Sequence, residues 1–170
     1  MLRKVIVTIG LGLGLLSGCA REGDPGALID QAVGFLNTQE VGKWIDLWVL
    51  ENRDPMRRVL LAQPEDEGLK NVKSAKLIRR VDVTGKVPIN PNYPFVAVRA
   101  YYLELDLEVK KEQPEFKNGR NHHLVMVLQK TPKGPWAIRH WGASPELEDL
   151  VKPRKMEPPK QPPQPQPPGK

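Results

Sequence analysis

The stretch FVAVRAYYLELDLEV, residues 95–109, decides the fold of this chain. In its second half apolar and acidic residues alternate strictly, as they do in a β-strand that buries one face and exposes the other. We therefore expect a long strand with an apolar row turned toward a core and an acidic row turned toward water. The expected inward residues are Leu103, Leu105, Leu107 and Val109, and the expected outward residues are Glu104, Asp106 and Glu108.

Three further segments show the same period of two and are predicted to be strands. They are residues 74–83, 121–130 and 136–142. Turn residues separate them, because Asn118-Gly119 precedes the second and TPKGP, residues 131–135, joins the second to the third. Such short connections favour antiparallel neighbours, so the sequence predicts an antiparallel sheet of about four strands.

Helical spacing dominates the residues before the strands. Asp24-Pro25 is a helix start with an acidic N-cap and a proline at the first helical position, and this helix is expected to reach about Leu36. A second helix is predicted from about Glu40 to Glu51, and a third from Asp54-Pro55 to Gln63-Pro64. Helices followed by strands predict an α+β fold, with the N-terminal helices packed on one face of the sheet.

The order of the elements, the tryptophan-bearing second helix and the closing GPWAI stretch at 134–138 give the chain a family resemblance. The chain resembles small bacterial lipoproteins of unknown function that carry a cystatin-like or nuclear-transport-factor-two-like domain. The resemblance implies a roll over about residues 25–144, in which a curved sheet wraps on helices. Such a roll hosts enzymes, binding modules and assembly domains, so the fold does not select a function.

The first eighteen residues are predicted to be a signal peptide. Met1-Leu2-Arg3-Lys4 is a short basic start, and the uncharged run at 5–16 is shorter than the ~20 residues of a membrane-spanning helix. An ordinary signal peptide followed by a chance cysteine, or an uncleaved anchor, is the alternative interpretation.

Leu16-Ser17-Gly18-Cys19 resembles the lipobox of bacterial lipoproteins. The resemblance implies that signal peptidase recognises Leu16, Ser17 and Gly18, that cleavage falls before Cys19, and that the Cys19 thiol carries diacylglycerol in a palmitate-bearing anchor. Because Ala20 rather than Asp follows, it implies the outer membrane of a double-membraned cell, or else the outer face of a plasma membrane. Cys19 is the only cysteine, so no disulfide and no thiolate site is expected.

Three parts are expected after the signal peptide: a tether at 19–24, a single α+β domain at 25–152 and a tail at 153–170. Eight of the eighteen tail residues are proline, which lacks the amide donor of helices and sheets, so we expect a solvated polyproline segment. The tail is a candidate contact for an envelope protein or a cell-wall polymer. The alternative is a terminus that only keeps the domain soluble.

The formal net charge of +6 is spread unevenly along the chain. Arg3 and Lys4 belong to the signal peptide, and the tail holds four basic residues against one acid. The domain itself is therefore near neutral and lacks the basic surface that nucleic-acid binding requires. We expect a membrane partner through the lipid on Cys19 and no nucleic acid.

The three histidines do not form a predicted metal site. His122 and His123 are neighbours in one strand and should point to opposite faces, while His140 is expected opposite Val127 or Met126 on the next strand. No metal and no cofactor is expected. An enzyme built on this roll would use His122 or His140 as its acid–base group.

A ligand pocket is predicted from the parity of the strands. Arg79 and Arg99 share the parity of the apolar residues and could hold an anion at the mouth of the roll, unless both extend to water at the rim. Lys76 and Arg80 have the opposite parity and are expected to pair with the acidic row. For several of the candidate pocket residues, packing in the core is the alternative interpretation. The candidate pocket residues are Arg79, Arg99, Trp44, Trp48, His122 and Trp136.

The expected function is that of a lipid-anchored extracytoplasmic lipoprotein, a non-catalytic binding or assembly module of the cell envelope. The alternative is a small-molecule-binding protein or a hydrolase- or isomerase-type enzyme that uses a cavity in the roll. The sequence holds no serine nucleophile elbow and no glycine-rich phosphate loop, which favours the non-catalytic interpretation.

Overall fold

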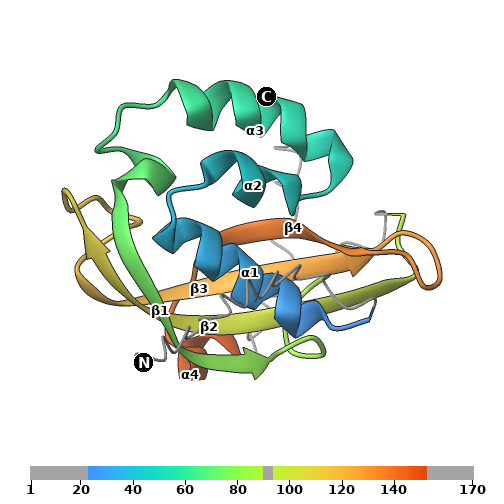
Figure 1. Cartoon of the computed structure of the whole chain (residues 1–170). Helices are drawn as coiled ribbons and strands as arrows, with labels where there is room; N and C mark the ends of the chain where they lie inside the picture. Colours follow the sequence, from blue (N-terminus) through green and yellow to red (C-terminus); the bar gives the residue numbers. More distant parts are fainter. Residues whose placement is uncertain (1–22, 90–93, 153–170) are drawn as a thin grey trace, which may run out of the picture.

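A computed structural model describes residues 23–89 and 94–152 (Figure 1). The signal peptide, Cys19 and the tail at 153–170 lie outside the described residues. One antiparallel sheet has the strand order β1-β2-β3-β4. Its strands are β1 (Val72–Asp82), β2 (Ala97–Val109), β3 (Gly119–Gln129) and β4 (Trp136–Ala143). Within the described residues, no helix is long and apolar enough to cross a membrane.

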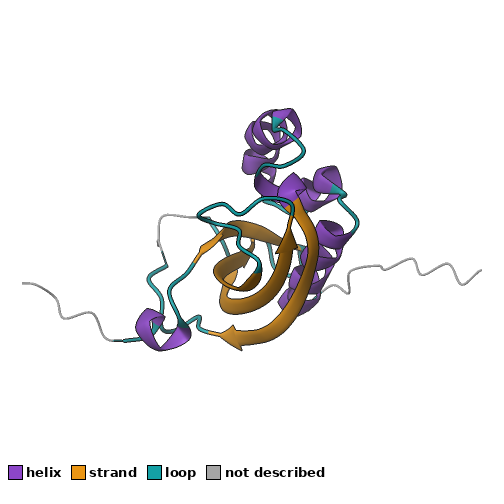
Figure 2. Cartoon of the chain, turned by 90° about the vertical axis from the view of Figure 1, so that its left-hand side faces the viewer, coloured by secondary structure: helices purple, strands orange, loops and turns teal. Residues whose placement is uncertain are grey.

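The sheet is curved, and most of the helices lie on one side of it (Figure 2). We call the face that α1 (Pro25–Asn37) and α2 (Val41–Asp46) cover the inner face. The longer helix α3 (Leu50–Ala62) packs on α2, away from the sheet (Figure 1). A short helix, α4 (Leu147–Leu150), lies on the opposite face, which we call the outer face. The predicted α+β fold, with helices on a curved four-stranded sheet, is confirmed.

β2 supplies the middle of the hydrophobic core. Its predicted inward row, from Leu103 to Val109, is buried at every second residue. Burial of each large aliphatic side chain contributes roughly 1.5–3 kcal/mol, so this row is a main source of the free energy that holds helices and sheet together. Its neighbours in the core include Ile29, Ala32, Ile45, Val125, Val127 and Ile138.

α1 begins where the sequence predicts. Asp24 is the N-cap, and its carboxylate accepts a hydrogen bond of 2.8 Å from the amide of Gly26. The first two turns are also tied to β1, because Arg80 donates to the Gly26 carbonyl at 2.8 Å and to the Asp30 carboxylate at 2.7 Å. The start of the helix is thus held by its own N-cap and by a side chain of β1.

The predicted boundary between the second and third helices is wrong. The second helix ends at Asp46, and the third begins at Leu50 and contains Pro55 rather than starting there. The residues between them pair with the edge of the sheet: the amide of Ile138 donates to the Leu47 carbonyl at 2.8 Å, and the amide of Val49 donates to the Ile138 carbonyl at 2.9 Å. The apolar stripe predicted that the helix continues through these residues. Instead, they form a β-bridge with the edge strand β4, whose backbone groups would otherwise lack partners.

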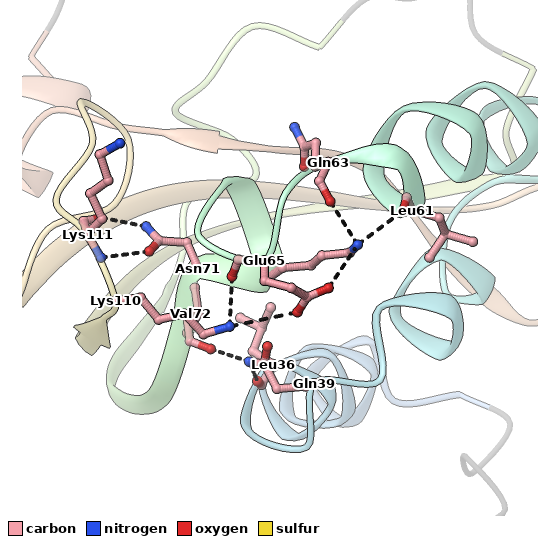
Figure 3. Close-up of polar contacts among 10 residues, drawn as sticks. Leu36, Gln39, Leu61, Gln63, Glu65, Asn71, Val72, Lys110 and Lys111 are labelled. Atoms are coloured by element: carbon pink, nitrogen blue, oxygen red, sulfur yellow. Dashed lines mark hydrogen bonds and ion pairs between the residues drawn. The ribbon is translucent and has the colours of Figure 1, made fainter.

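A polar network joins α3 and the following loop to the sheet (Figure 3). Lys70 Nζ donates to the carbonyls of Leu61 and Gln63, at 3.0 and 2.8 Å. These carbonyls lie at the C-terminal end of α3, where no amide of a further helical turn is present to bond them. Lys70 also lies 3.2 Å from the Glu65 carboxylate. Lys110 Nζ donates to the Glu65 carbonyl at 2.7 Å, so the loop is held from two sides.

Asn71, fully buried just before β1, connects this region to the end of β2. Its side-chain amide donates to the Lys111 carbonyl at 2.6 Å, and its side-chain carbonyl accepts from the Lys111 amide at 2.8 Å (Figure 3). One side chain thus satisfies both backbone groups of a residue on another segment, as a strand partner would.

We predict that Asn71→Ala lowers the free energy of unfolding by about 1–3 kcal/mol, because both backbone groups of Lys111 lose their partner. Urea denaturation measures the loss. Lys76→Ala, on the exposed side of β1, is the matched control and is expected to change stability by less than about 0.5 kcal/mol. Equal effects of the two substitutions would contradict the role given to Asn71.

Candidate functional site

The outer face of the sheet carries a small second core. Val83, Val87, Ala100 and Tyr102 are buried there. Leu147, Leu150 and Val151, from α4 and the residue after it, pack against them. The sequence predicted helices on one face only, because the four residues of α4 are too few to show a periodic pattern. The C-terminal segment therefore covers part of a face that was expected to be open.

A β-bulge in β1 determines which arginine reaches this face. In the register of β1 with β2, Leu77 lies opposite Leu105, but Arg79 lies opposite Glu104, so Ile78 is an extra residue. The bulge reverses the face of the sheet to which each following side chain of β1 points. Arg79 therefore shares the outer face with Glu104, and Arg80 turns to the inner face and binds α1. The predicted orientations of these two arginines, which assumed a regular strand, are wrong.

The bulge places three side chains in one row across the sheet. Arg79 on β1 lies opposite Glu104 on β2, and Glu104 lies opposite His122 on β3. Side chains directly opposite each other in antiparallel strands have Cβ atoms about 5 Å apart. The row forms the floor of a pocket of about 400 Å³, whose lining residues are Arg79, Tyr102, Glu104, Arg120, His122, Glu146, Leu147 and Glu148.

Two polar contacts organise this outer-face pocket. The Tyr102 hydroxyl and His122 Nδ1 lie 2.8 Å apart, with the proton on one or the other according to the histidine tautomer. Burial, and then the nearby Glu104 carboxylate, raise the pKa of the Tyr102 hydroxyl. Glu104 itself is only 8 % exposed, and Arg120 Nη1 approaches its carboxylate at 3.0 Å.

The predicted acidic row is therefore only partly exposed. Asp106 and Glu108 are exposed as expected, but Glu104 is buried beside the C-terminal segment. Ion pairs do form across the strands, with partners other than those predicted: Lys73 binds Glu108 at 3.2 Å, and Arg120 binds Glu104.

The six residues of the predicted pocket do not form one site. Arg79 and His122 lie together in the outer-face pocket, whereas Arg99 has the inner-face parity, opposite Val127, and is exposed 3.9 Å from Asp82. The tryptophans belong to the inner side. Trp44 and Trp48 are buried in the core, with ring centroids 5.2 Å apart, and Trp136 packs partly buried against the same core.

The three histidines lie in three different environments. His122 and His123 point to opposite faces, and His140 lies opposite Met126, exposed on the outer face. The sequence did not predict the burial of His123. This residue is 3 % exposed and lies in the core between Phe116 and Trp141. Among residues 23–89 and 94–152, no group of three His, Cys, Asp or Glu side chains has the geometry of a metal site.

The chemistry available in the outer-face pocket is polar and of mixed charge. Arg79 makes no hydrogen bond or ion pair with any residue that the structure describes, and the same holds for the Glu146 and Glu148 carboxylates on the other side. The Tyr102–His122 pair adds a hydroxyl and an imidazole. Tyr102, Glu104 and Arg120 were not among the predicted pocket residues, although the register of β2 and β3 makes Tyr102 and His122 diagonal neighbours on one face of the sheet.

The buried histidine makes stability depend on pH. Desolvation, and then the charge of the neighbouring His122, lower the pKa of His123 to about 4 from the ordinary value of 6.5. The unfolded chain therefore binds more protons than the folded chain between pH 6.5 and 4. Stability is complete above pH 6.5 and is lost as the pH falls through this window.

We predict that protonation linked to His123 lowers the free energy of unfolding by roughly 3 kcal/mol between pH 7 and pH 4. His123→Phe should remove this contribution to the pH dependence. Urea denaturation of both proteins at several pH values measures the difference, which separates His123 from the carboxylates that titrate in the same range. Parallel pH profiles of the two proteins would contradict a neutral buried imidazole at position 123.

The chain was compared with models of protein families, with curated proteins and with solved structures. None of the three comparisons gave a match to this chain.

Proposed function

We propose that this chain is a lipid-anchored lipoprotein of the cell envelope whose domain is a non-catalytic binding module. The observation that carries the binding role is the outer-face pocket, in which Arg79 on the sheet and Glu146 and Glu148 at α4 make no hydrogen bond or ion pair with any described residue. The lipobox-like Leu16-Ser17-Gly18-Cys19 after a signal-like run supports the anchor and the extracytoplasmic location. Two acyl chains on one cysteine suffice for stable attachment to a membrane.

The charges of the pocket indicate the class of its ligand. The Arg79 guanidinium, which pairs with nothing among residues 23–89 and 94–152, suits a carboxylate, and the Glu146 and Glu148 carboxylates, likewise unpaired there, suit an ammonium group. A ligand with only one kind of charge would satisfy one side and oppose the other. The pocket therefore fits a small zwitterion, such as an amino acid or a short peptide segment of a partner protein.

The tail at 153–170 is proposed as an accessory contact. It follows directly from the C-terminal segment that borders the pocket, and it combines proline with four basic residues. A partner that reads polyproline helices, or an anionic cell-wall polymer, has the matching chemistry.

An acid–base enzyme is the second candidate, and the Tyr102–His122 hydrogen bond favours it. A hydroxyl bonded to an imidazole inside a pocket can hold and pass a proton. An enzyme of this kind would convert its bound ligand, and a binding module would return it unchanged.

For the anchor, we predict that Cys19→Ser abolishes labelling by radioactive palmitate and releases the protein from the membrane fraction. Cys19 is the one cysteine of the chain, so no other thiol can take the diacylglycerol. Retained label in the Cys19→Ser protein would contradict the anchor. A chain that ends at Lys152 is the matched control, since it keeps the lipid and loses the tail, and crosslinking in intact cells compares its partners with those of the full chain.

For the pocket, we predict that diglycine binds more tightly than N-acetylglycine or glycinamide, each of which lacks one of the two charges. Arg79→Ala should weaken diglycine binding about tenfold or more, the loss expected for a charge-assisted contact. Isothermal titration with the full chain measures the affinities, and Lys76→Ala on the same strand is the control.

Equal affinity for the three glycine compounds, or no effect of Arg79→Ala, would contradict a zwitterion site. Mass spectrometry of the recovered diglycine decides between the two candidate functions. Unchanged diglycine supports the binding module, and hydrolysed diglycine that depends on His122 supports the enzyme.

A further inference from the structure

A second pocket lies where the start of α3 meets the β3–β4 hairpin. It has a volume of about 220 Å³, and we call it the hairpin pocket. Two segments that are far apart in the sequence supply the solvent-accessible part of its lining. These accessible residues are Leu50 and Arg53 from α3, and Lys130, Thr131, Pro135 and Ala137 from the hairpin and the start of β4.

Contacts between the two segments hold the hairpin pocket in shape. The bridge to the edge of the sheet joins Val49, the residue before α3, to Ile138 of β4 by a backbone hydrogen bond of 2.9 Å. On the hairpin side, Lys130 Nζ lies 2.7 Å from the Glu51 carboxylate in the first turn of α3. The start of α3 is therefore tied to the hairpin at two levels, and the hollow between them has a defined width.

Exposed apolar surface gathers in this pocket. Leu50 is 74 % exposed, more than any other large apolar side chain that the structure describes. Across from it, Pro135 is exposed and Ala137 is half-buried, and the buried side chain of Leu128 lies in the same lining. The apolar part of a ligand would remove this surface from water, which favours binding.

The charge of the lining is positive. Lys130 is balanced by Glu51, and the hydrogen bond between them is the main cause that lowers the pKa of the Glu51 carboxyl. Arg53 Nε donates to the Trp48 carbonyl at 2.8 Å, which fixes the direction of the guanidinium. Its two terminal nitrogens make no hydrogen bond or ion pair with residues 23–89 and 94–152. Arg53 therefore offers a positive charge and oriented donors to a ligand in the pocket.

We propose that the hairpin pocket binds a short aliphatic carboxylate, with its chain against Leu50, Pro135 and Ala137 and its carboxylate on Arg53. A guanidinium matches a carboxylate with paired, charge-assisted hydrogen bonds. The exposed Thr131 hydroxyl adds a donor at the same pocket. The volume is below the roughly 300–1,000 Å³ of sites for drug-sized ligands, so the aliphatic chain has to be short.

This site is separate from the zwitterion site. Leu128 lines the hairpin pocket and His122 lines the outer-face pocket, and the two residues lie six positions apart on β3. That spacing is roughly 20 Å along a strand. The carboxylate site therefore does not rest on the proposed function, and a ligand in one pocket leaves the other accessible.

The first test varies the ligand. Isothermal titration of the purified full chain compares octanoate with 1-octanol, octylamine and acetate, below the concentration at which octanoate forms micelles. Octanoate should bind about tenfold or more tightly than 1-octanol, because only octanoate forms the charge-assisted contact with Arg53. Octylamine has the opposite charge and acetate lacks the chain, so both should bind more weakly still. Any of these three compounds binding as tightly as octanoate would overturn the proposal.

The second test varies the charge of the pocket. Arg53→Gln should weaken octanoate binding about tenfold or more, because it removes the guanidinium and keeps a side-chain donor for the Trp48 carbonyl. Arg53→Lys keeps the charge and should retain part of the affinity. Arg99→Gln, at an exposed arginine of β2 outside the pocket, is the matched control and should bind octanoate like the parent chain. Unchanged octanoate affinity in Arg53→Gln would overturn the proposal.

A further variant covers the case in which Arg53→Gln folds poorly. Ala137→Leu adds bulk to the lining without removing a hydrogen bond of the Ala137 side chain, and it should lose octanoate binding. Ala143→Leu, at an exposed alanine at the other end of β4, is the matched control and should keep it. Octanoate binding that persists in Ala137→Leu would place the ligand elsewhere and overturn the proposal.

Two other occupants of the pocket are separated by the same measurements. If octanoate binds only to a chain that ends at Lys152, the tail at 153–170 is the occupant and the proposal is overturned. Flotation of the Cys19→Ser chain with phosphatidylglycerol vesicles tests for a membrane lipid. Vesicle binding that depends on Arg53, without octanoate binding, would also overturn the proposal. Octanoate binding by the full chain that is lost in Arg53→Gln and in Ala137→Leu supports it.

Discussion

The antiparallel pairing of β2 with both of its neighbours is the constraint on which the rest of the structure depends. β2 is the longest strand of the sheet, and it lies between β1 and β3. The alternation of apolar and polar residues along β2 fixes which side chains enter the core. A slip of one residue would turn the leucine row to water and the acidic row to the helices. The cost of burying the exposed carboxylates of Asp106 and Glu108 therefore holds the register together with the apolar packing.

The placement of the two neighbouring histidines follows from this register. The row through Glu104 meets His122 on β3, and the next row, through Leu103, meets His123 on the other face. One of the adjacent histidines thus lines the outer-face pocket and the other lies in the core, because a strand turns consecutive side chains to opposite faces. The extra residue in β1 then adds Arg79 to the outer-face pocket. One strand pairing and one bulge account for the placement of these polar side chains.

The sequence predicted what depends on simple periodicity and missed what depends on local exceptions. The four strands, the inward leucine row and the opposite directions of His122 and His123 follow from a period of two. The bulge at Ile78 could not be predicted, because the stretch KLIRRV alternates acceptably in either register. The early end of α2 depends on the backbone of β4, a segment about ninety residues away. Likewise, burial of His123 needs the loop that carries Phe116, and no pattern in β3 indicates that loop.

The clamp that Arg80 forms on the first turn of α1 has a mechanical consequence. If the proposed lipid on Cys19 holds the chain, tension between a membrane and the domain would enter the described fold at Asp24 and Pro25. The guanidinium passes part of that load sideways into β1 through the Gly26 carbonyl and Asp30, instead of along the helix alone. Unwinding of the helix from its attached end would have to break these charge-assisted contacts first. With the proposed anchor, the start of α1 would thus be reinforced where the load reaches the domain.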